Sequence, residues 1–290
     1  MILNYQILHY LIEYLIKLVF LNYILNLAFI ILIFFIIVFN LFIIPRLISN
    51  KFLNSNLKSI RNRDIHNKII SPFGGIAIFF SFSLSFLILL LLLHFIDQSY
   101  INVDFIDNYY IFFISSFIIF LLGLFDDFYN LNYIIKLFIQ LLISYIFVFI
   151  LDIKIESFYG LFDFFVFSEF YLKLFSVLVS VFIINSFNLI DGVDGLASCV
   201  GSFIFISFSI IFYFNNLFFD SLLCILLISI LLSFLYFNLT PAKIFMGDSG
   251  SLFIGCIIAF FSLKICNLKI DTVGTVNPVF ILCILSYPSF

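Results

Sequence analysis

Two adjacent carboxylates and a lysine are the first residues in this sequence whose types and spacing could support chemistry. Asp126 and Asp127 end a long apolar run, and Lys136 lies nine residues beyond Asp127. Carboxylates at a helix C-terminus oppose the helix dipole, and neighbouring carboxylates repel each other unless a cation lies close by. The pair therefore indicates either a solvated helix end or an acid pair that handles a metal ion or a phosphate, with Lys136 as the countercharge of that phosphate.

A second polar segment, residues 185–197, contains Asn185, Asn188, Asp191 and Asp194, with a glycine after each aspartate. A turn alone would explain an Asp-Gly pair. It would not explain two carboxamides at the membrane end of a helix, because burying an amide without a partner costs free energy. The segment therefore favours a polar site, and a simple turn is the alternative.

The third segment, residues 241–251, places Asp248 and Ser249 between glycines at the start of another apolar run. Both residue types are common helix N-caps, so a plain cap is one interpretation. The other is a helix start that binds an anion or a metal ion.

The fourth segment is basic and precedes a pair of glycines. Its bases, Arg61, Arg63, His66 and Lys68, are typical of a loop beside the membrane, although His66 could also reach a substrate phosphate. Gly74 and Gly75 follow, and glycines allow backbone N–H groups to approach a phosphate or another ligand closely.

The composition shows which elements must position these segments. Of the 290 residues 65% are hydrophobic and only 10% are charged, with mean hydropathy +1.30. An average soluble domain has about 25% charged residues, so a soluble enzyme, a disordered chain and a disulfide-rich secreted module are excluded. The net charge of −3, with no basic tail, argues against nucleic acid as a partner.

Apolar runs of about 20 residues predict membrane-spanning helices, because only helices and closed barrels satisfy the backbone in lipid. We therefore predict an all-α, polytopic membrane bundle, residues 1–290 forming a single domain. The nine predicted spans are 23–45, 74–96, 109–125, 133–151, 172–187, 196–214, 217–239, 250–266 and 274–290.

Alternating crossings place all four polar segments on one side, together with eight lysines and arginines. The positive-inside rule assigns that side to the cytoplasm. Asp220 falls on the opposite side, where we expect its replacement by asparagine to be nearly silent.

Together, the segments predict a centre for phosphoryl transfer that depends on Mg²⁺. Carboxylate and carboxamide oxygens suit a hard cation, whereas lysines and glycine N–H groups suit phosphates. A cytoplasmic face gives access to a soluble diphosphate, and the bilayer gives access to a lipid phosphate. An ion-coupled transporter that uses its acids as cation sites is the alternative from another class.

The same segments resemble the polyprenyl-phosphate N-acetylhexosamine-1-phosphate transferases, the MraY/WecA-like family. The matching motifs are R-x-x-H before P-x-G-G (63–75), G-x-x-D-D (123–127), N-x-x-N-L-x-D-G-x-D-G-L-A (185–197) and P-A-K-x-F-M-G-D-S-G-S-L-F-x-G (241–255). The forms of the first and last motifs resemble WecA more than MraY. The family pattern would continue with a His-rich cytoplasmic loop beyond residue 290, so we expect the chain to be truncated at its C-terminus.

The resemblance implies transfer of N-acetylhexosamine 1-phosphate, with N-acetylglucosamine as the expected sugar, from a UDP-sugar to undecaprenyl phosphate with release of UMP. It implies a bacterial inner-membrane protein that initiates O-antigen, teichoic-acid-type or other envelope glycans, or, as an alternative, an MraY-type enzyme of peptidoglycan synthesis. A homodimer is a further expectation.

The resemblance also assigns roles to the polar residues. It implies that Asn185 and Asp248 ligate Mg²⁺, with Mn²⁺ as a substitute, and that Asp126, Asp127 and Lys136 serve the lipid phosphate as catalytic residues. The residues implied to bind substrate are His66, Gly74, Gly75, Asn188, Asp191 and Asp194.

Overall fold

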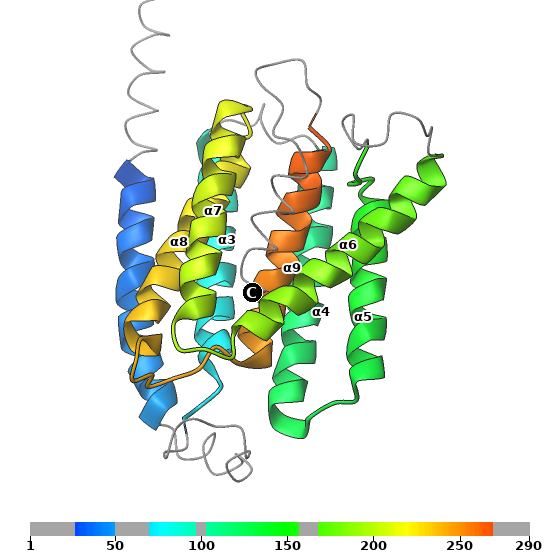
Figure 1. The fold of residues 1–290 in the computed structure, drawn as a ribbon. Coiled ribbons are helices and arrows are strands. Elements are labelled where there is room, and N and C mark those ends of the chain that lie inside the picture. The colour runs from blue at the N-terminus through cyan, green and yellow to red at the C-terminus, as the bar shows by residue number, and fades with distance from the viewer. Residues whose placement is uncertain (1–26, 50–69, 97–102, 157–167, 269–290) are drawn as a thin grey trace, which may run out of the picture.

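The computed structural model describes residues 27–49, 70–96, 103–156 and 168–268. Its helices are Leu27–Ser49, α3 (Gly74–Ile96), α4 (Val103–Tyr129), α5 (Tyr133–Tyr145), α6 (Glu169–Ile190), α7 (Leu196–Phe214), α8 (Phe218–Asn238) and α9 (Gly247–Cys266). The end of α5 continues as a short π-helix, η2 (Ile146–Ile150). Neighbouring helices run along one another as a bundle, as Figure 1 shows, and α6 crosses it obliquely.

Eight helices in the described part of the chain are long and apolar enough to cross a membrane, which confirms eight of the predicted spans and the all-α membrane class. The ninth, 274–290, lies outside the described residues. Three helices extend further into the polar segments than the apolar runs predicted. α4 continues through Asp127, α6 includes Asn188, and α9 begins at Gly247. Hydropathy marks the part of a helix that meets lipid, whereas the backbone hydrogen bonds of the helix continue past that part.

The helix α9 forms the centre of the bundle. Of its membrane-spanning window 94% is buried, and it packs against α3, α4, α6 and α7. Small residues let the helices approach closely. A Cβ atom on Gly75 of α3 would collide with the backbone of Gly250, and one on Gly255 would lie 3.0 Å from the carbonyl oxygen of Ile184 in α6. The polar residues at the start of α9 are therefore held by several helices at once.

A buried ion pair lies near the other end of α9 and corrects the expectation for Asp220. This carboxylate is 2% exposed, and the Lys264 ammonium lies 2.7 Å from its Oδ2. Lys264 also donates to the Tyr109 hydroxyl at 2.6 Å, and that hydroxyl donates to Asp220. The three residues join α4, α8 and α9. Asp220 therefore faces the interior of the bundle, and the expectation that its replacement would be nearly silent is wrong.

We expect Asp220→Asn to destabilise the protein by about 3 kcal/mol, because removing one member of a buried pair leaves the other charge uncompensated. Thermal unfolding in detergent measures this effect. The double variant Asp220→Leu/Lys264→Met should be more stable than Asp220→Asn, since it removes both charges. If Asp220→Asn unfolds at the temperature of the unsubstituted protein, the ion pair contributes little to the fold.

Candidate functional site

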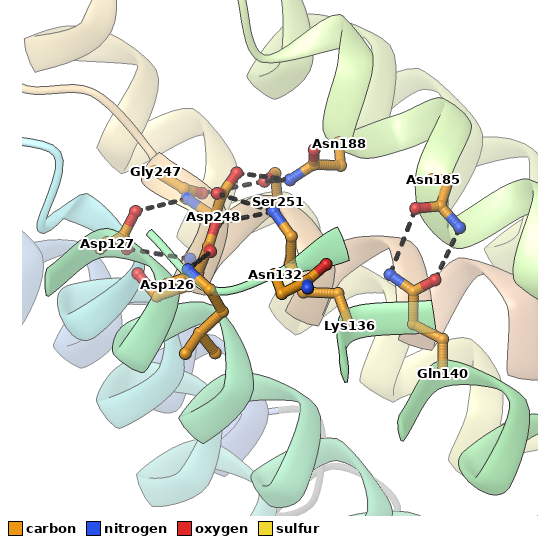
Figure 2. A network of polar contacts seen from close by, with 12 residues as sticks. Asp126, Asp127, Asn132, Lys136, Gln140, Asn185, Asn188, Gly247, Asp248 and Ser251 are labelled. Atoms are coloured by element: carbon orange, nitrogen blue, oxygen red, sulfur yellow. Dashed lines mark hydrogen bonds and ion pairs between the residues drawn. The ribbon is translucent and has the colours of Figure 1, made fainter. Parts of the chain in front are cut away.

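Four helix ends meet at the lower end of the bundle in Figure 1. They are the C-termini of α4 and α6 and the N-termini of α5 and α9, and each carries residues singled out from the sequence. Figure 2 shows their side chains pointing toward one another. Residues as far apart in the chain as Asp127 and Ser249, 122 positions, therefore contribute to one polar cluster.

Lys136 connects the carboxylates of two helices. Its Nζ lies 2.8 Å from Asp126 Oδ2 on α4 and 3.8 Å from Asp248 Oδ2 on α9. The turn before α5 fixes this arrangement, since Leu131 N–H donates to Asp126 Oδ1 at 2.6 Å and Asn132 caps the helix. The Asp248 side chain is 33% exposed and that of Lys136 27%, so this edge of the cluster is open to a ligand.

Asn188 brings α6 to the same carboxylate. Its Nδ2 donates to Asp248 Oδ1 and to Ser251 Oγ, both at 2.8 Å. Both oxygens of Asp248 therefore face a polar group, one from α5 and one from α6. The Asn188 amide N–H group makes these contacts, which leaves its oxygen as the donor atom for a cation.

Two other carboxylates hold the first turn of α9. Asp127 accepts hydrogen bonds from the N–H groups of Asp248 at 2.8 Å and Ser249 at 3.0 Å, and Asp191 accepts from that of Gly247 at 3.0 Å. Helix N-termini favour negative charge. Gly247 has φ +72°, and a Cβ atom there would collide with the Pro72 carbonyl oxygen. The N–H groups that could have bound an anion thus bind protein carboxylates.

Asp191 and Asp194 order the turns between helices. Asp194 accepts from Ala242 N–H at 3.2 Å, which ties the turn between α6 and α7 to the loop before α9. Burial raises the pKa of Asp191 well above its ordinary value; the Gly247 N–H group opposes the shift, and the charges of Asp127 and Asp248 add to it. Burial therefore favours the uncharged form of Asp191, and a cation bound near these carboxylates would lower its pKa again.

The residues fit Mg²⁺, although the described part of the chain has no group of three or more His, Cys, Asp or Glu side chains that could hold a metal ion. Mg²⁺ commonly keeps several waters and binds one or two carboxylates together with substrate phosphates. Asp248, partly exposed and next to the Asn188 amide, offers that kind of donor set.

Asn185 lies elsewhere. Its amide pairs with that of Gln140 on α5 and also donates to the Val181 carbonyl oxygen at 2.8 Å. The structure therefore brings Asn188, and not Asn185, into contact with Asp248. Ligation of Mg²⁺ by Asn185 stays a prediction, and its amide oxygen already accepts a hydrogen bond from Gln140.

The two glycines that begin α3 have different surroundings from those expected. Gly74 N–H donates to the Phe245 carbonyl oxygen at 3.0 Å and Gly75 N–H to that of Met246 at 2.8 Å. A phosphate was expected here because glycine N–H groups could bind it. Both N–H groups instead donate to protein carbonyls. His66 lies outside the described residues.

Sequence reasoning missed Gln140 and Ser251. Gln140 is 1% exposed in the middle of an apolar run, one helical turn beyond Lys136. A polar residue inside a membrane span is expensive unless it is partnered, and this signal could have identified it. Ser251 was treated only as part of a motif, although it shares the Asn188 amide with Asp248.

We expect Asp127→Asn to destabilise the protein, because an amide NH₂ group cannot accept a hydrogen bond from a backbone N–H group. One of the two N–H groups would lose its partner, at a cost of about 1–3 kcal/mol. Thermal unfolding in detergent checks the result, with Asp107→Asn, an exposed aspartate at the far end of α4, as the control. Unchanged unfolding combined with lost activity would instead give Asp127 a direct chemical role.

Comparison with known proteins matches residues 109–266 to the model of a family described as Glycosyl transferase family 4. A Bacillus subtilis protein named probable undecaprenyl-phosphate N-acetylglucosaminyl 1-phosphate transferase is 31% identical over 222 residues, which are 76% of this chain and 58% of that protein. The phospho-N-acetylmuramoyl-pentapeptide-transferases of Staphylococcus saprophyticus and Streptococcus mutans are 47% and 42% identical over 81 residues, 28% of this chain. These matches cover 25% and 24% of the two relatives, so the chain spans well under two thirds of the length of each.

Proposed function

Because the chain belongs to glycosyl transferase family 4, we propose that it transfers N-acetylglucosamine 1-phosphate from UDP-N-acetylglucosamine to undecaprenyl phosphate and releases UMP. The observation that carries the proposal is the contact of Lys136 with carboxylates of two helices, Asp126 and Asp248, at a partly exposed edge. The relative that covers 76% of the chain is named for this sugar.

In this reaction an oxygen of the lipid phosphate bonds to the β-phosphorus of the UDP-sugar. The bond from that phosphorus to the bridging oxygen breaks, and UMP leaves with the bridging oxygen. Two anions must approach each other, so most of the catalysis is positioning and charge stabilisation. Mg²⁺, held by Asp248 and the Asn188 oxygen, would supply positive charge to the diphosphate, with Mn²⁺ as a substitute.

Lys136 would attract the lipid phosphate, because its ammonium group is the positive charge that pairs with the carboxylates of this cluster in the described chain. A proton on that phosphate would pass to Asp126. We propose Asp126 over Asp127 for this role because Asp126 contacts Lys136, which would pair with that phosphate, whereas both oxygens of Asp127 hold the backbone of α9. Asp191 and Asp194 would shape the nucleotide-sugar pocket through the turns that they fix.

We further propose that the protein is a multi-pass protein of the bacterial inner membrane with this cluster on the cytoplasmic side, where UDP-sugars are made. The bias of lysines and arginines supports this orientation. Cysteines at exposed Tyr129 and Phe214, in a chain whose native cysteines are serines, should react with an impermeant thiol reagent from opposite sides, Tyr129 from the cytoplasm.

A second substrate is supported by the 81-residue segment that is 47% identical to a phospho-N-acetylmuramoyl-pentapeptide-transferase. The deciding experiment supplies membranes containing the protein with undecaprenyl phosphate and either UDP-N-acetylglucosamine or UDP-N-acetylmuramoyl-pentapeptide. We expect UMP release with the first donor, dependent on the lipid phosphate and on Mg²⁺. Release with the second donor alone would establish the peptidoglycan reaction, and cation-driven solute uptake without UMP release would support a transporter.

A further inference from the structure

A reciprocal pair of carboxamides connects α5 and α6 next to the candidate site. Gln140 Nε2 donates to Asn185 Oδ1 at 3.3 Å, and Asn185 Nδ2 donates to Gln140 Oε1 at 2.6 Å. Figure 2 shows the two amides facing each other across the gap between the helices. Gln140 is 1% exposed. Each amide thus satisfies the other in surroundings where water is scarce.

The pair lies in register with two residues of the site. Gln140 follows Lys136 by four positions on α5, and Asn185 precedes Asn188 by three on α6, so each pair of residues shares a helix face. Lys136 and Asn188 both approach Asp248. The amide pair is therefore about one helical turn, or 5.4 Å along the axes, from the residues that meet at this carboxylate.

The packing of the helices makes this link important. The helices α5 and α9 both pack mainly against α4 and α6, and α9 carries Asp248. The separation of Lys136 from Asp248 is thus set through α4 and α6. Lys136 lies 2.8 Å from its partner on α4 but 3.8 Å from Asp248, a distance that a small movement of α5 would lengthen.

We propose that Gln140 and Asn185 are a positioning pair that fixes α5 against α6, so that Lys136 and Asn188 are presented together to Asp248. This inference rests on the proposed function for its kinetic consequence. It gives Asn185 a role different from metal ligation, because both ends of its amide are used within the protein.

Kinetics of four variants test the pair. Gln140→Ala and Asn185→Ala should each lower kcat about tenfold, or about 1.4 kcal/mol, with the KM for the UDP-sugar changed less than threefold. The exchange Gln140→Asn/Asn185→Gln keeps two amides of the same summed length and should recover most of the activity. Ser144→Ala is the matched control, because Ser144 is buried one turn further along α5 and its hydroxyl has no hydrogen-bond partner among the described residues.

Two further measurements separate positioning from stability. Gln140→Leu keeps a side chain of similar size in this buried position and should lose kcat about tenfold when the rate is expressed per amount of folded protein. An amine-reactive reagent should modify Lys136 about threefold faster in Gln140→Ala than in the unsubstituted protein, since Lys136 would lose part of its ion pairing.

The proposal is overturned if the exchange variant, folded in equal amount, is as impaired as the single variants. It is also overturned if Asn185→Ala is impaired while Gln140→Ala is not, which would be the pattern of a residue that acts alone on a metal ion. Absence of transfer by the unsubstituted protein would instead refute the proposed function. In that case the labelling rate of Lys136 decides for or against the pair.

Discussion

Replacing Asp248 by asparagine is expected to lower turnover by about 10²-fold or more, a barrier increase of about 3 kcal/mol. The folded state should survive, because the first turn of α9 is held by the carboxylates of Asp127 and Asp191 and not by the side chain of Asp248. The loss is electrostatic. Asparagine keeps the size of the side chain but removes the charge on which the affinity for a hard cation depends.

Asp107→Asn is the matched control for this variant. Asp107 is an exposed aspartate on α4, and about 30 Å of helix separates it from Asp127. It should show unchanged turnover and unchanged Mg²⁺ dependence at equal amounts of folded protein. If Asp248→Asn also keeps the turnover and the Mg²⁺ dependence of the unsubstituted protein, the cation does not bind at Asp248.

Lys136→Met is expected to have an effect of similar size, at least 10²-fold on turnover or about 3 kcal/mol. Methionine keeps the apolar stem but leaves Asp126, whose side chain is 6% exposed, without the ammonium at 2.8 Å. The carboxylates of the cluster would then repel each other and the approaching lipid phosphate. Arginine should restore turnover only in part, because its planar guanidinium does not reproduce a compact ammonium.

Initial rates at varied undecaprenyl phosphate measure this effect, and we expect kcat to fall and KM for the lipid to rise. Lys173→Met is the control. Lys173 lies at the other end of the bundle in a partly exposed network with Asp152 and Glu169, where ion pairs contribute little. Equal losses in the two lysine variants would show that the effect is a general loss of charge and not a property of the site.

The membrane spans could be predicted from the sequence because hydropathy over about 20 residues is a local property. The side of the bundle on which the polar segments meet could also be predicted. Their grouping followed from alternating crossings, and the contacts among Asp126, Lys136, Asn188 and Asp248 agree with it. Helix ends were less predictable, since α4, α6 and α9 continue into polar residues.

The partners of individual side chains could not be predicted. Asn185 and Asn188 are three positions apart on one helix face, and only contacts with other helices distinguish them. Asn185 pairs with Gln140, 45 positions away, and Asn188 donates to Asp248, 60 positions away. The burial of Asp220 was missed for the same reason, because its partner Lys264 lies 44 positions away and a charge count does not give the rotation of a helix about its axis.

The most direct test of a phosphoryl-transfer site follows the two phosphates of the donor separately. Membranes containing the protein receive undecaprenyl phosphate, Mg²⁺ and UDP-N-acetylglucosamine labelled with ³²P at either the α- or the β-phosphate. We predict that the β label enters the lipid fraction and that the α label appears in UMP in equal amount, with both transfers lost in Asp248→Asn. A β label that stays in the water-soluble fraction while UDP or free sugar accumulates would contradict this account.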